Sequence, residues 1–355
     1  MKEDFEGVLE ETKRQVWPVI EKYLEKLRAF PSFCQIPEKY KGEEEFHRRL
    51  VADYPERKGK YLRPTLTLLT ASAMGFPREK ALLTAAAMQT SEDWILNHDD
   101  IEDNSLERRG KSTLFRIYGK ELALNAGDGL QVLMWKMLED NVEELGVKKG
   151  LEIMEEFFWM LSRTILGQTV ELRWVKEKRM DLEEEDILFI LESKTGYYTI
   201  GGPMRLGAIL GGAEEKQLEA IYRFGKILGR SFQIIDDVLD VTSNFRGLKK
   251  QTGNDIYEGK KTLLLVHLFN CLGRKEKERV IKILNKEREE KTEEEVGEVI
   301  FLMEKYGSID YAKEKARQFA REAKVIFEKE LGFLREERAR EEIRMGIDFI
   351  VERDY

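Results

Sequence analysis

The spacing of apolar residues along the chain predicts a protein built almost entirely of helices. Apolar side chains recur every three or four positions through most of the sequence, as they do on a helix with one buried face. Strict alternation of apolar and polar residues, which marks a half-buried strand, is not sustained over any useful length. The predicted fold class is therefore all-α.

The helical segments are separated by residues that end helices, such as Gly75 and Gly146. The polar, glycine-containing stretch from Thr242 to Lys261 predicts a functional loop. Neither a short-period repeat nor a low-complexity linker divides the sequence, so we expect a single domain over residues 1–355. The predicted helices cover residues 5–29, 43–53, 61–74, 78–103, 119–140, 147–178, 184–210, 214–242, 261–271, 276–287, 292–305, 308–331 and 334–352.

The composition mainly argues against certain classes of protein, such as nucleic-acid-binding and membrane-spanning proteins. The 355 residues are 42% hydrophobic and 36% charged, with a formal net charge of -8. Nucleic-acid-binding proteins usually carry a basic patch, and none stands out here, so no nucleic-acid partner is expected. Cys34 and Cys271 imply neither a metal-ligand pattern nor a disulfide framework. No apolar run approaches the roughly 20 residues that span a bilayer, and the acidic start is unlike a secretory signal, so a soluble, cytoplasmic protein is predicted.

One carboxylate pattern occurs twice. Each copy has the form D-D-x-x-D and follows an apolar stretch. On a helix the first and last Asp lie on one face, where like charges destabilise the helix. A divalent cation offsets that repulsion and the cost of placing carboxylates near an apolar interior. The two copies are Asp99, Asp100 and Asp103, and Asp236, Asp237 and Asp240.

The type of ligand atom narrows the choice of metal ion. Oxygen-only ligands favour Mg²⁺, Mn²⁺ or Ca²⁺ over Zn²⁺. Neither copy has the glycine turn or the alternating ligands of an EF-hand calcium loop. Two solvated acidic faces are the alternative, since the chain has 68 acidic residues. Two copies that both follow apolar runs favour the metal site.

Basic residues accompany both carboxylate clusters. Arg offers paired hydrogen bonds to a phosphate, and Lys acts as a point charge. Their positions predict two anion sites, one bridged by metal and the other bound directly by cations. The basic features are Gly59-Lys60-Tyr61-Leu62-Arg63-Pro64, the pair Arg108-Arg109, Lys194-Thr195, and Lys250 and Lys260.

The ordered motifs resemble those of the trans-isoprenyl diphosphate synthases, which include farnesyl and geranylgeranyl diphosphate synthases. GKYLRP resembles an early motif of that family, and DDIEDNSLERRG resembles its first aspartate-rich motif with the trailing arginine pair. GQTVEL, with Glu171 in the acidic place, KTGYY, FQIIDDVLD and KKQTGNDIYEGKKT follow in the family's order. Five or six ordered motifs over most of the chain are a specific signal.

The resemblance implies an antiparallel helix bundle around a deep central cavity, normally as a homodimer or higher homo-oligomer. It implies condensation of isopentenyl diphosphate with an allylic diphosphate (dimethylallyl, geranyl or farnesyl) by Mg²⁺-assisted ionisation, condensation and elimination, with Mn²⁺ as a possible substitute. The metal ligands would be Asp99, Asp100, Asp103, Asp236, Asp237 and Asp240.

The resemblance also assigns roles to the remaining motif residues. Isopentenyl diphosphate would bind Gly59, Lys60, Arg63 and Arg109. The allylic diphosphate would be bound with help from Arg108, Lys194, Lys250 and Lys260. Lys194, Thr195 and Gln233 would lie beside the allylic cation, and Phe232 would pack near the acceptor.

Two positions depart from the family pattern. Lys58 stands where the early motif usually begins with Gly. Glu92, seven residues before Asp99, stands where the family usually places His or Gln against the acceptor diphosphate. An unpaired carboxylate there would repel the acceptor, so we expect Glu92 to pair with a cation such as Lys60 or Arg63.

The helix before Asp99 predicts the product length. On an ideal helix Ile95, Ser91 and Trp94 follow one another along a stripe that drifts away from Asp99. The resemblance agrees, since an aromatic residue five positions before the first motif often limits the product. Trp94 is then the floor for a C20 product, with C15 as intermediate or co-product. Packing of Trp94 against a neighbouring helix is the alternative.

Two other functions share part of this sequence pattern. A terpene cyclase shares the fold and the first Asp motif, but it needs no acceptor motif and usually has a different second metal motif. A low-activity regulatory subunit of a heteromeric synthase typically loses one Asp motif, whereas both are present here. The alternation of basic and acidic residues at 272–295 predicts a solvated helical face.

Overall fold

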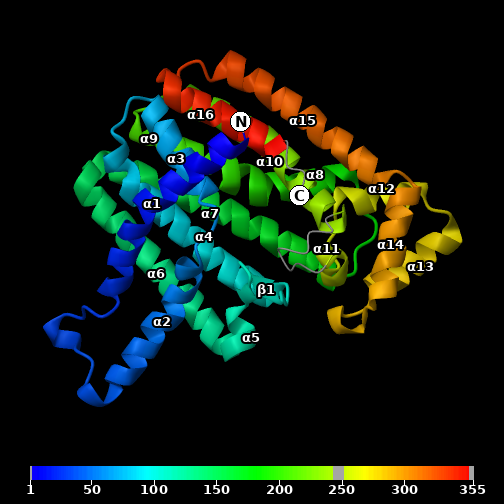
Figure 1. Ribbon diagram of the computed structural model, residues 1–355, viewed down its shortest axis with the longest axis horizontal. Coiled ribbons are helices and arrows are strands. Elements are labelled where there is room, and N and C mark those ends of the chain that lie inside the picture. Colours follow the sequence, from blue (N-terminus) through cyan, green and yellow to red (C-terminus); the bar gives the residue numbers. More distant parts are fainter. Residues whose placement is uncertain (1, 243–251, 352–355) are drawn as a thin grey trace. The chain divides into compact units, whose positions relative to one another are not determined.

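The computed structural model describes residues 2–242 and 252–351, and it is helical almost throughout (Figure 1). The all-α prediction is confirmed. The α-helices are α1 (Lys2–Lys26), α2 (Lys41–Arg57), α3 (Leu62–Ala73), α4 (Leu82–Glu102), α5 (Leu114–Tyr118), α6 (Lys120–Leu145), α7 (Val147–Lys176), α8 (Glu184–Leu191), α9 (Gly202–Leu210), α10 (Glu215–Thr242), α11 (Asn254–Glu258), α12 (Leu263–Cys271), α13 (Arg274–Leu284), α14 (Glu293–Lys305), α15 (Ser308–Glu330) and α16 (Glu337–Val351).

The smaller elements are a two-stranded hairpin, one π-helix and several 3₁₀ turns. The hairpin pairs β1 (Glu107–Arg108) with β2 (Lys111–Ser112) in antiparallel register. The π-helix η4 covers Glu192–Gly201 and interrupts the segment that periodicity predicts as one helix over 184–210. The 3₁₀ turns are Ser32–Cys34, Glu38–Tyr40, Arg78–Ala81 and Arg288–Glu290.

The chain forms two compact units, each with its own packing. The first comprises residues 1–157, 203–214 and 334–343, and the second comprises 158–202, 215–333 and 344–355. The boundaries fall inside α7 and α16, which are continuous helices. The prediction of one domain over residues 1–355 therefore stays a prediction. None of the helices described combines the length and apolar character that a bilayer crossing requires.

In the first unit, α4 is the buried centre. It packs against α1, α3 and α6. The run from Leu83 to Trp94 is buried throughout and is rich in Ala, Thr and Ser, which allow neighbouring helices to approach closely. At Gly127 of α6 an added Cβ would come within 2.2 Å of Nε2 of His98, so a larger residue there would displace the His98 ring.

In the second unit, α10 is the centre, and α15 and η4 pack along it. Two glycine pairs bring the backbones of η4 and α10 together. A Cβ on Gly229 would lie 2.3 Å from the Cα of Gly196, and a Cβ on Gly225 would lie 2.3 Å from the Cα of Gly201. This close approach fixes the side chains of η4 against those of α10.

Candidate active site

The first aspartate motif ends α4 in the first unit. Asp99 and Asp100 belong to the last turn, and Asp103 is the residue after it, with φ -87° and ψ -2°. Asp100 is fully buried, and Nε of Arg108 donates to its two oxygens at 2.9 and 3.1 Å. The Tyr54 hydroxyl also donates to Asp100. Burial raises the pKa of Asp100, and the contacts with Arg108 and Tyr54 oppose that rise.

The hairpin β1–β2 sends two adjacent arginines to different partners. Its turn is Arg109-Gly110, with φ values of 53° and 75°, the left-handed geometry that two-residue hairpin turns need. Arg57 fastens the hairpin by donating to the carbonyls of Arg108 and Ser112 at 3.1 and 2.9 Å. Arg108 reaches Asp100, whereas Nη1 of Arg109 lies 2.8 Å from Oδ1 of Asp93.

The early basic motif meets Arg109. A Cβ on Gly59 would come 2.7 Å from Nη2 of Arg109, so glycine leaves room for the guanidinium. Nη1 of Arg63 lies 3.1 Å from Oε1 of Glu92, and Nη2 of Arg109 lies 3.8 Å from the same oxygen. The prediction that Glu92 pairs with a cation is confirmed. Lys60 is exposed beside them.

Asp93 is a buried acid that the motifs did not single out. It is 1% exposed, and besides Arg109 it accepts a hydrogen bond from Gln89 at 3.3 Å. Burial raises its pKa to about 6 although Arg109 acts in the opposite direction. Burial alone would lower the pKa of Arg109, but the charges of Asp93 and Glu92 raise it above its ordinary value.

The residues predicted to set chain length lie on α4. Ser91 is buried and donates to the Met88 carbonyl at 2.7 Å, and Ile95 is partly buried. The ring of Trp94 meets that of His98 edge-on, with centroids 6.1 Å apart. His98 lies against Gly127, so Trp94 belongs to the side of α4 that faces α6. Its role as a floor stays a prediction.

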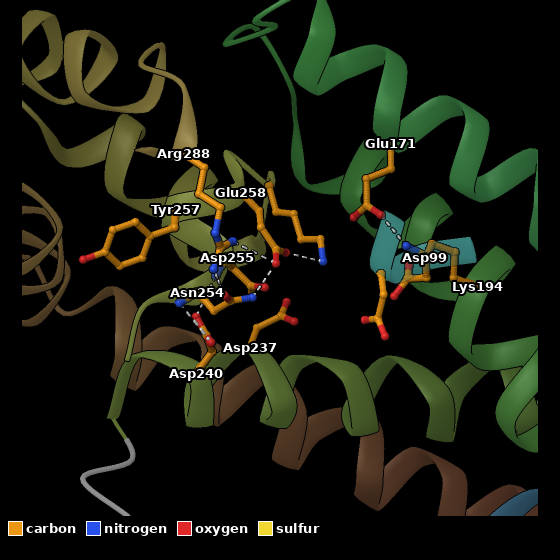
Figure 2. Close-up of polar contacts among 12 residues, drawn as sticks. Asp99, Glu171, Lys194, Asp237, Asp240, Asn254, Asp255, Tyr257, Glu258 and Arg288 are labelled. Atoms are coloured by element: carbon orange, nitrogen blue, oxygen red, sulfur yellow. Dashed lines mark hydrogen bonds and ion pairs between the residues drawn. The ribbon is translucent and has the colours of Figure 1, made fainter. Parts of the chain in front are cut away.

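In the second unit, three predicted residues form a hydrogen-bonded chain. The Thr195 hydroxyl donates to Oε1 of Gln233 at 2.8 Å, and Nε2 of Gln233 donates to Oδ1 of Asp237 at 3.0 Å. Thr195 belongs to η4 and the other two to α10, so the glycine contacts between these helices set the link. Lys194 forms an ion pair with Glu171 of α7 (Figure 2). Phe232, one residue before Gln233, is half-buried.

The second aspartate motif lies on α10. Burial raises the pKa of Asp237 to about 7, and the charges of Asp236, Glu171 and Asp240 add to the rise. The Asp240 carboxylate accepts the backbone N–H groups of Asn254 and Asp255 at 3.2 and 3.0 Å. Figure 2 shows Asp240 beneath the start of α11.

A pocket opens beside this motif. Asp255 of α11 is an acidic lining residue that the motifs did not assign, although it lies in the loop motif KKQTGNDIYEGKKT. Burial raises its pKa well above the ordinary value, and Asp240 adds to the rise. Lys250 lies outside the described residues. The pocket is lined by Asp237, Val241, Asp255, Ile256, Lys260, Thr262, Leu265, Leu284 and Met303.

The fit to a divalent cation differs between the acidic residues. Asp237 and Asp255 are buried carboxylates whose charged forms are destabilised, which a cation would reverse. Asp100 already pairs with Arg108 and Tyr54. Within residues 2–242 and 252–351, no three Asp, Glu, His or Cys side chains are arranged to hold a metal ion.

Comparisons with known proteins identify the family. Residues 44–303 match the polyprenyl synthetase family. The short-chain isoprenyl diphosphate synthase of Methanothermobacter thermautotrophicus is 34% identical over 84% of this chain and 87% of its own. The geranylgeranyl pyrophosphate synthetase structure from Pyrococcus horikoshii is 30% identical over 99% of both chains, with a TM-score of 0.83.

A more distant structure agrees on the fold. The geranylgeranyl pyrophosphate synthase of Corynebacterium glutamicum, solved with isoprenyl diphosphate and magnesium, is 20% identical over 99% of both chains, with a TM-score of 0.83. These relatives do not favour the terpene cyclase or the regulatory subunit. The chain belongs to the polyprenyl synthetase family and is a prenyltransferase of the short-chain prenyl diphosphate synthase class.

Proposed function

We propose that this protein condenses isopentenyl diphosphate with allylic diphosphates and releases geranylgeranyl diphosphate, with farnesyl diphosphate as intermediate or co-product. One observation carries the proposal. Arg108 and Arg109 are adjacent, yet Arg108 contacts the aspartate motif and Arg109 contacts the GKYLRP motif. The hairpin thus supplies one cation to each of two anion subsites, as a reaction between two diphosphates requires.

The residues divide into a donor subsite and an acceptor subsite. Arg108, Lys194 and Lys260 bind the allylic diphosphate together with Lys250, which lies outside the described residues. Gly59, Lys60, Arg63 and Arg109 bind isopentenyl diphosphate. Donation from Gln233 to Asp237 leaves the Gln233 amide oxygen facing Thr195. This oxygen and the Thr195 carbonyl stabilise positive charge on the allylic carbon, and Phe232 packs against the acceptor.

Magnesium is the proposed metal. The proposed ligands of this ion are Asp99, Asp103, Asp236 and Asp237. Asp240 would support the site by binding the start of α11, and Asp100 would support it by binding Arg108. Bound Mg²⁺ neutralises the diphosphate that leaves. Carboxylate-only ligands suit it, and the Corynebacterium glutamicum enzyme was solved with magnesium.

We further propose a cytoplasmic homodimer. Large apolar side chains are exposed along two consecutive helices, which an unpartnered surface rarely tolerates. A second copy of the chain would cover them. Cys34 and Cys271 are free and exposed, which suits a reducing compartment. The mass from light scattering tests the dimer. The exposed residues are Leu122, Leu124, Val132 and Trp135 on α6, and Val147, Leu151, Phe158, Trp159, Ile165 and Leu166 on α7.

Product analysis tests the function. The protein is incubated with Mg²⁺, radiolabelled isopentenyl diphosphate and each allylic primer in turn, and the products are dephosphorylated and separated by chain length. The proposal expects labelled C20 alcohol that depends on both substrates and is abolished by EDTA. Cyclic products formed from an allylic diphosphate alone, without isopentenyl diphosphate, would instead identify a terpene cyclase.

A further inference from the structure

Two basic residues from the segment after α13 contact α11. The sequence pattern at 272–295 predicts a solvated helical face, which is wrong for Arg288 and Lys291. The Arg288 side chain is 10% exposed and Lys291 is 7% exposed. The chain leaves α13 at Leu284 and turns through the short 3₁₀ helix Arg288–Glu290, which a capping box between Glu287 and Glu290 closes.

Arg288 joins the two ends of α11. Its Nη2 donates to Oδ1 of Asn254 at 2.6 Å, and its Nη1 donates to Oε1 of Glu258 at 3.2 Å. Nδ2 of Asn254 donates to the same Glu258 oxygen at 2.6 Å, which closes a three-residue cluster (Figure 2). Lys291 adds a bond to the Tyr257 carbonyl at 2.7 Å. A five-residue helix is marginal alone, so these contacts hold it in shape.

This cluster connects directly to the pocket of the second aspartate motif. At the start of α11, the backbone of Asn254 and Asp255 donates to Asp240. At its end, Oε2 of Glu258 lies 2.7 Å from Nζ of Lys260. Asp255 and Lys260 both line the pocket that Asp237 lines. The position of α11 therefore determines where an acid and a cation stand around Asp237.

We propose that Arg288 is a positioning residue for the diphosphate site: by binding Asn254 and Glu258 it fixes α11, and with it Asp255 and Lys260, for a metal-bound diphosphate. The inference rests on the proposed function, because it assigns a diphosphate to the site beside Asp237 and Lys260. Arg288 lies outside every motif that resembles the family.

The charges explain why an arginine is needed. The Glu258 side chain is only 2% exposed, and it faces both Arg288 and Lys260. Arg288 and Lys260 share the charge of the same carboxylate, so Arg288 offsets part of the pull of Glu258 on Lys260. Without Arg288, Glu258 would hold Lys260 more tightly, and Lys260 would be less available to an anionic ligand. Lysine could pair with Glu258, but it cannot reproduce the fork that also reaches Asn254.

The test compares Arg288→Gln with Arg279→Gln in the full-length protein. Arg279 comes from the same region but pairs with Glu298 at an exposed site, so it is the matched control. Three quantities are measured: affinity for inorganic pyrophosphate with Mg²⁺ by calorimetry, amide exchange over residues 253–260 by mass spectrometry, and steady-state KM and kcat for the allylic substrate.

The proposal expects Arg288→Gln to weaken pyrophosphate binding about tenfold and to speed exchange over 253–260 by at least about tenfold. The allylic KM should rise more than kcat falls, Arg279→Gln should match wild type, and Arg288→Lys should recover part of the affinity. If Arg288→Gln binds pyrophosphate within about twofold of wild type with unchanged exchange, the proposal is wrong.

A second variant covers a folding failure of Arg288→Gln. Asn254→Ala leaves the Arg288–Glu258 pair in place but removes the amide that joins the pair to the start of α11. Faster exchange with weaker binding supports the proposal, and wild-type values for both overturn it. A wild-type protein that binds Mg²⁺ and pyrophosphate without condensing prenyl substrates would count against the proposed function alone. A wild-type protein that does not bind pyrophosphate would overturn the positioning role.

Discussion

Arg109 and Asp93 form a buried ion pair, with Nη1 of the arginine 2.8 Å from Oδ1 of the acid. Arg109 is also one of the cations that the family resemblance assigns to the acceptor diphosphate, together with Lys60 and Arg63. Asp93 therefore pairs with this cation before any substrate binds. Oε1 of Glu92 lies near both Arg109 and Arg63. The proposed acceptor subsite thus contains carboxylates that compete with the substrate diphosphate for its cations.

The acceptor affinity should depend on the protonation of Asp93. Its pKa is about 6, above the ordinary carboxyl value, so the folded protein protonates it as pH falls through 6. Protonation removes the charge that competes for Arg109. The other groups around Asp93 are Gln89, Glu92 and Tyr61.

The comparison variant is Asp93→Asn, which mimics the protonated acid at every pH. The ratio of wild-type to variant KM for isopentenyl diphosphate should be roughly fivefold at pH 7.5 and approach one at pH 5.5, since an ion pair contributes about 1 kcal/mol. Using a ratio cancels the titration of the substrate itself. A ratio that stays constant between these pH values would mean that Asp93 does not compete for Arg109.

Glu92→Gln should change the acceptor KM only modestly. Glu92 is paired with Arg63 at 3.1 Å, so it does not present a bare negative charge to the substrate. We expect KM for isopentenyl diphosphate to fall by less than about tenfold, or ~1.4 kcal/mol, with kcat little changed. Steady-state kinetics at fixed allylic substrate measures this, and a larger change would mean that Glu92 faces the diphosphate directly.

The two aspartate motifs should each be essential for turnover. Asp99→Ala and Asp236→Ala are expected to lower kcat by orders of magnitude while circular dichroism shows an unchanged helix content. Clustered carboxylates gain little stability without a metal, so their loss should not unfold the protein. Near wild-type turnover at saturating Mg²⁺ in either variant would contradict a mechanism that uses both motifs.

The close contact between η4 and α10 should make Gly229 intolerant of a side chain. A Cβ there would lie 2.3 Å from the Cα of Gly196, and backbone cannot move aside as a flexible side chain does. Gly229→Ala should lower the free energy of unfolding by about 1–3 kcal/mol and reduce kcat, because Thr195 shifts from Gln233.

The matched control is Gly297→Ala on α14, where a Cβ would meet no atom within 4 Å. It should stabilise the helix slightly, by up to about 1 kcal/mol, since alanine is the better helix former. Urea unfolding of both variants decides the matter. Equal stability of the two would show that η4 can move away from α10.

Trp94→Ala should lengthen the product. Removing a buried indole opens space for further five-carbon units if the growing chain ends there. Dephosphorylated products of wild type and variant, separated by chain length, should shift from C20 to longer alcohols. An unchanged product distribution would mean that Trp94 only packs beside His98 and does not limit the chain. A wild-type product longer than C25 would mean that no residue at this level of α4 ends the cavity.

The sequence by itself determined the helical fold class, most helix boundaries and the family. Helical periodicity depends on neighbouring residues alone, so the helix predicted at 308–331 nearly coincides with α15 (Ser308–Glu330). The ordered motifs identify the family without any coordinates. The local sequence pattern did not predict elements that are very short or that are shaped by contacts distant in the chain. The hairpin around Arg109-Gly110 is too short to show alternation, and η4 is shaped by its contact with α10.

Only the tertiary structure decided which charges meet. For Glu92 the sequence left Lys60 and Arg63 open as partners, and the structure shows the pair with Arg63. No motif indicated the contacts of Asp93 with Arg109 or of Arg288 with Asn254 and Glu258. The sequence shows that Arg288 is charged, but burial and partner geometry give that charge its effect. Periodicity treats every Lys, Arg and Glu as a solvated residue, and a chain that is 36% charged offers too many possible pairs to choose among without coordinates.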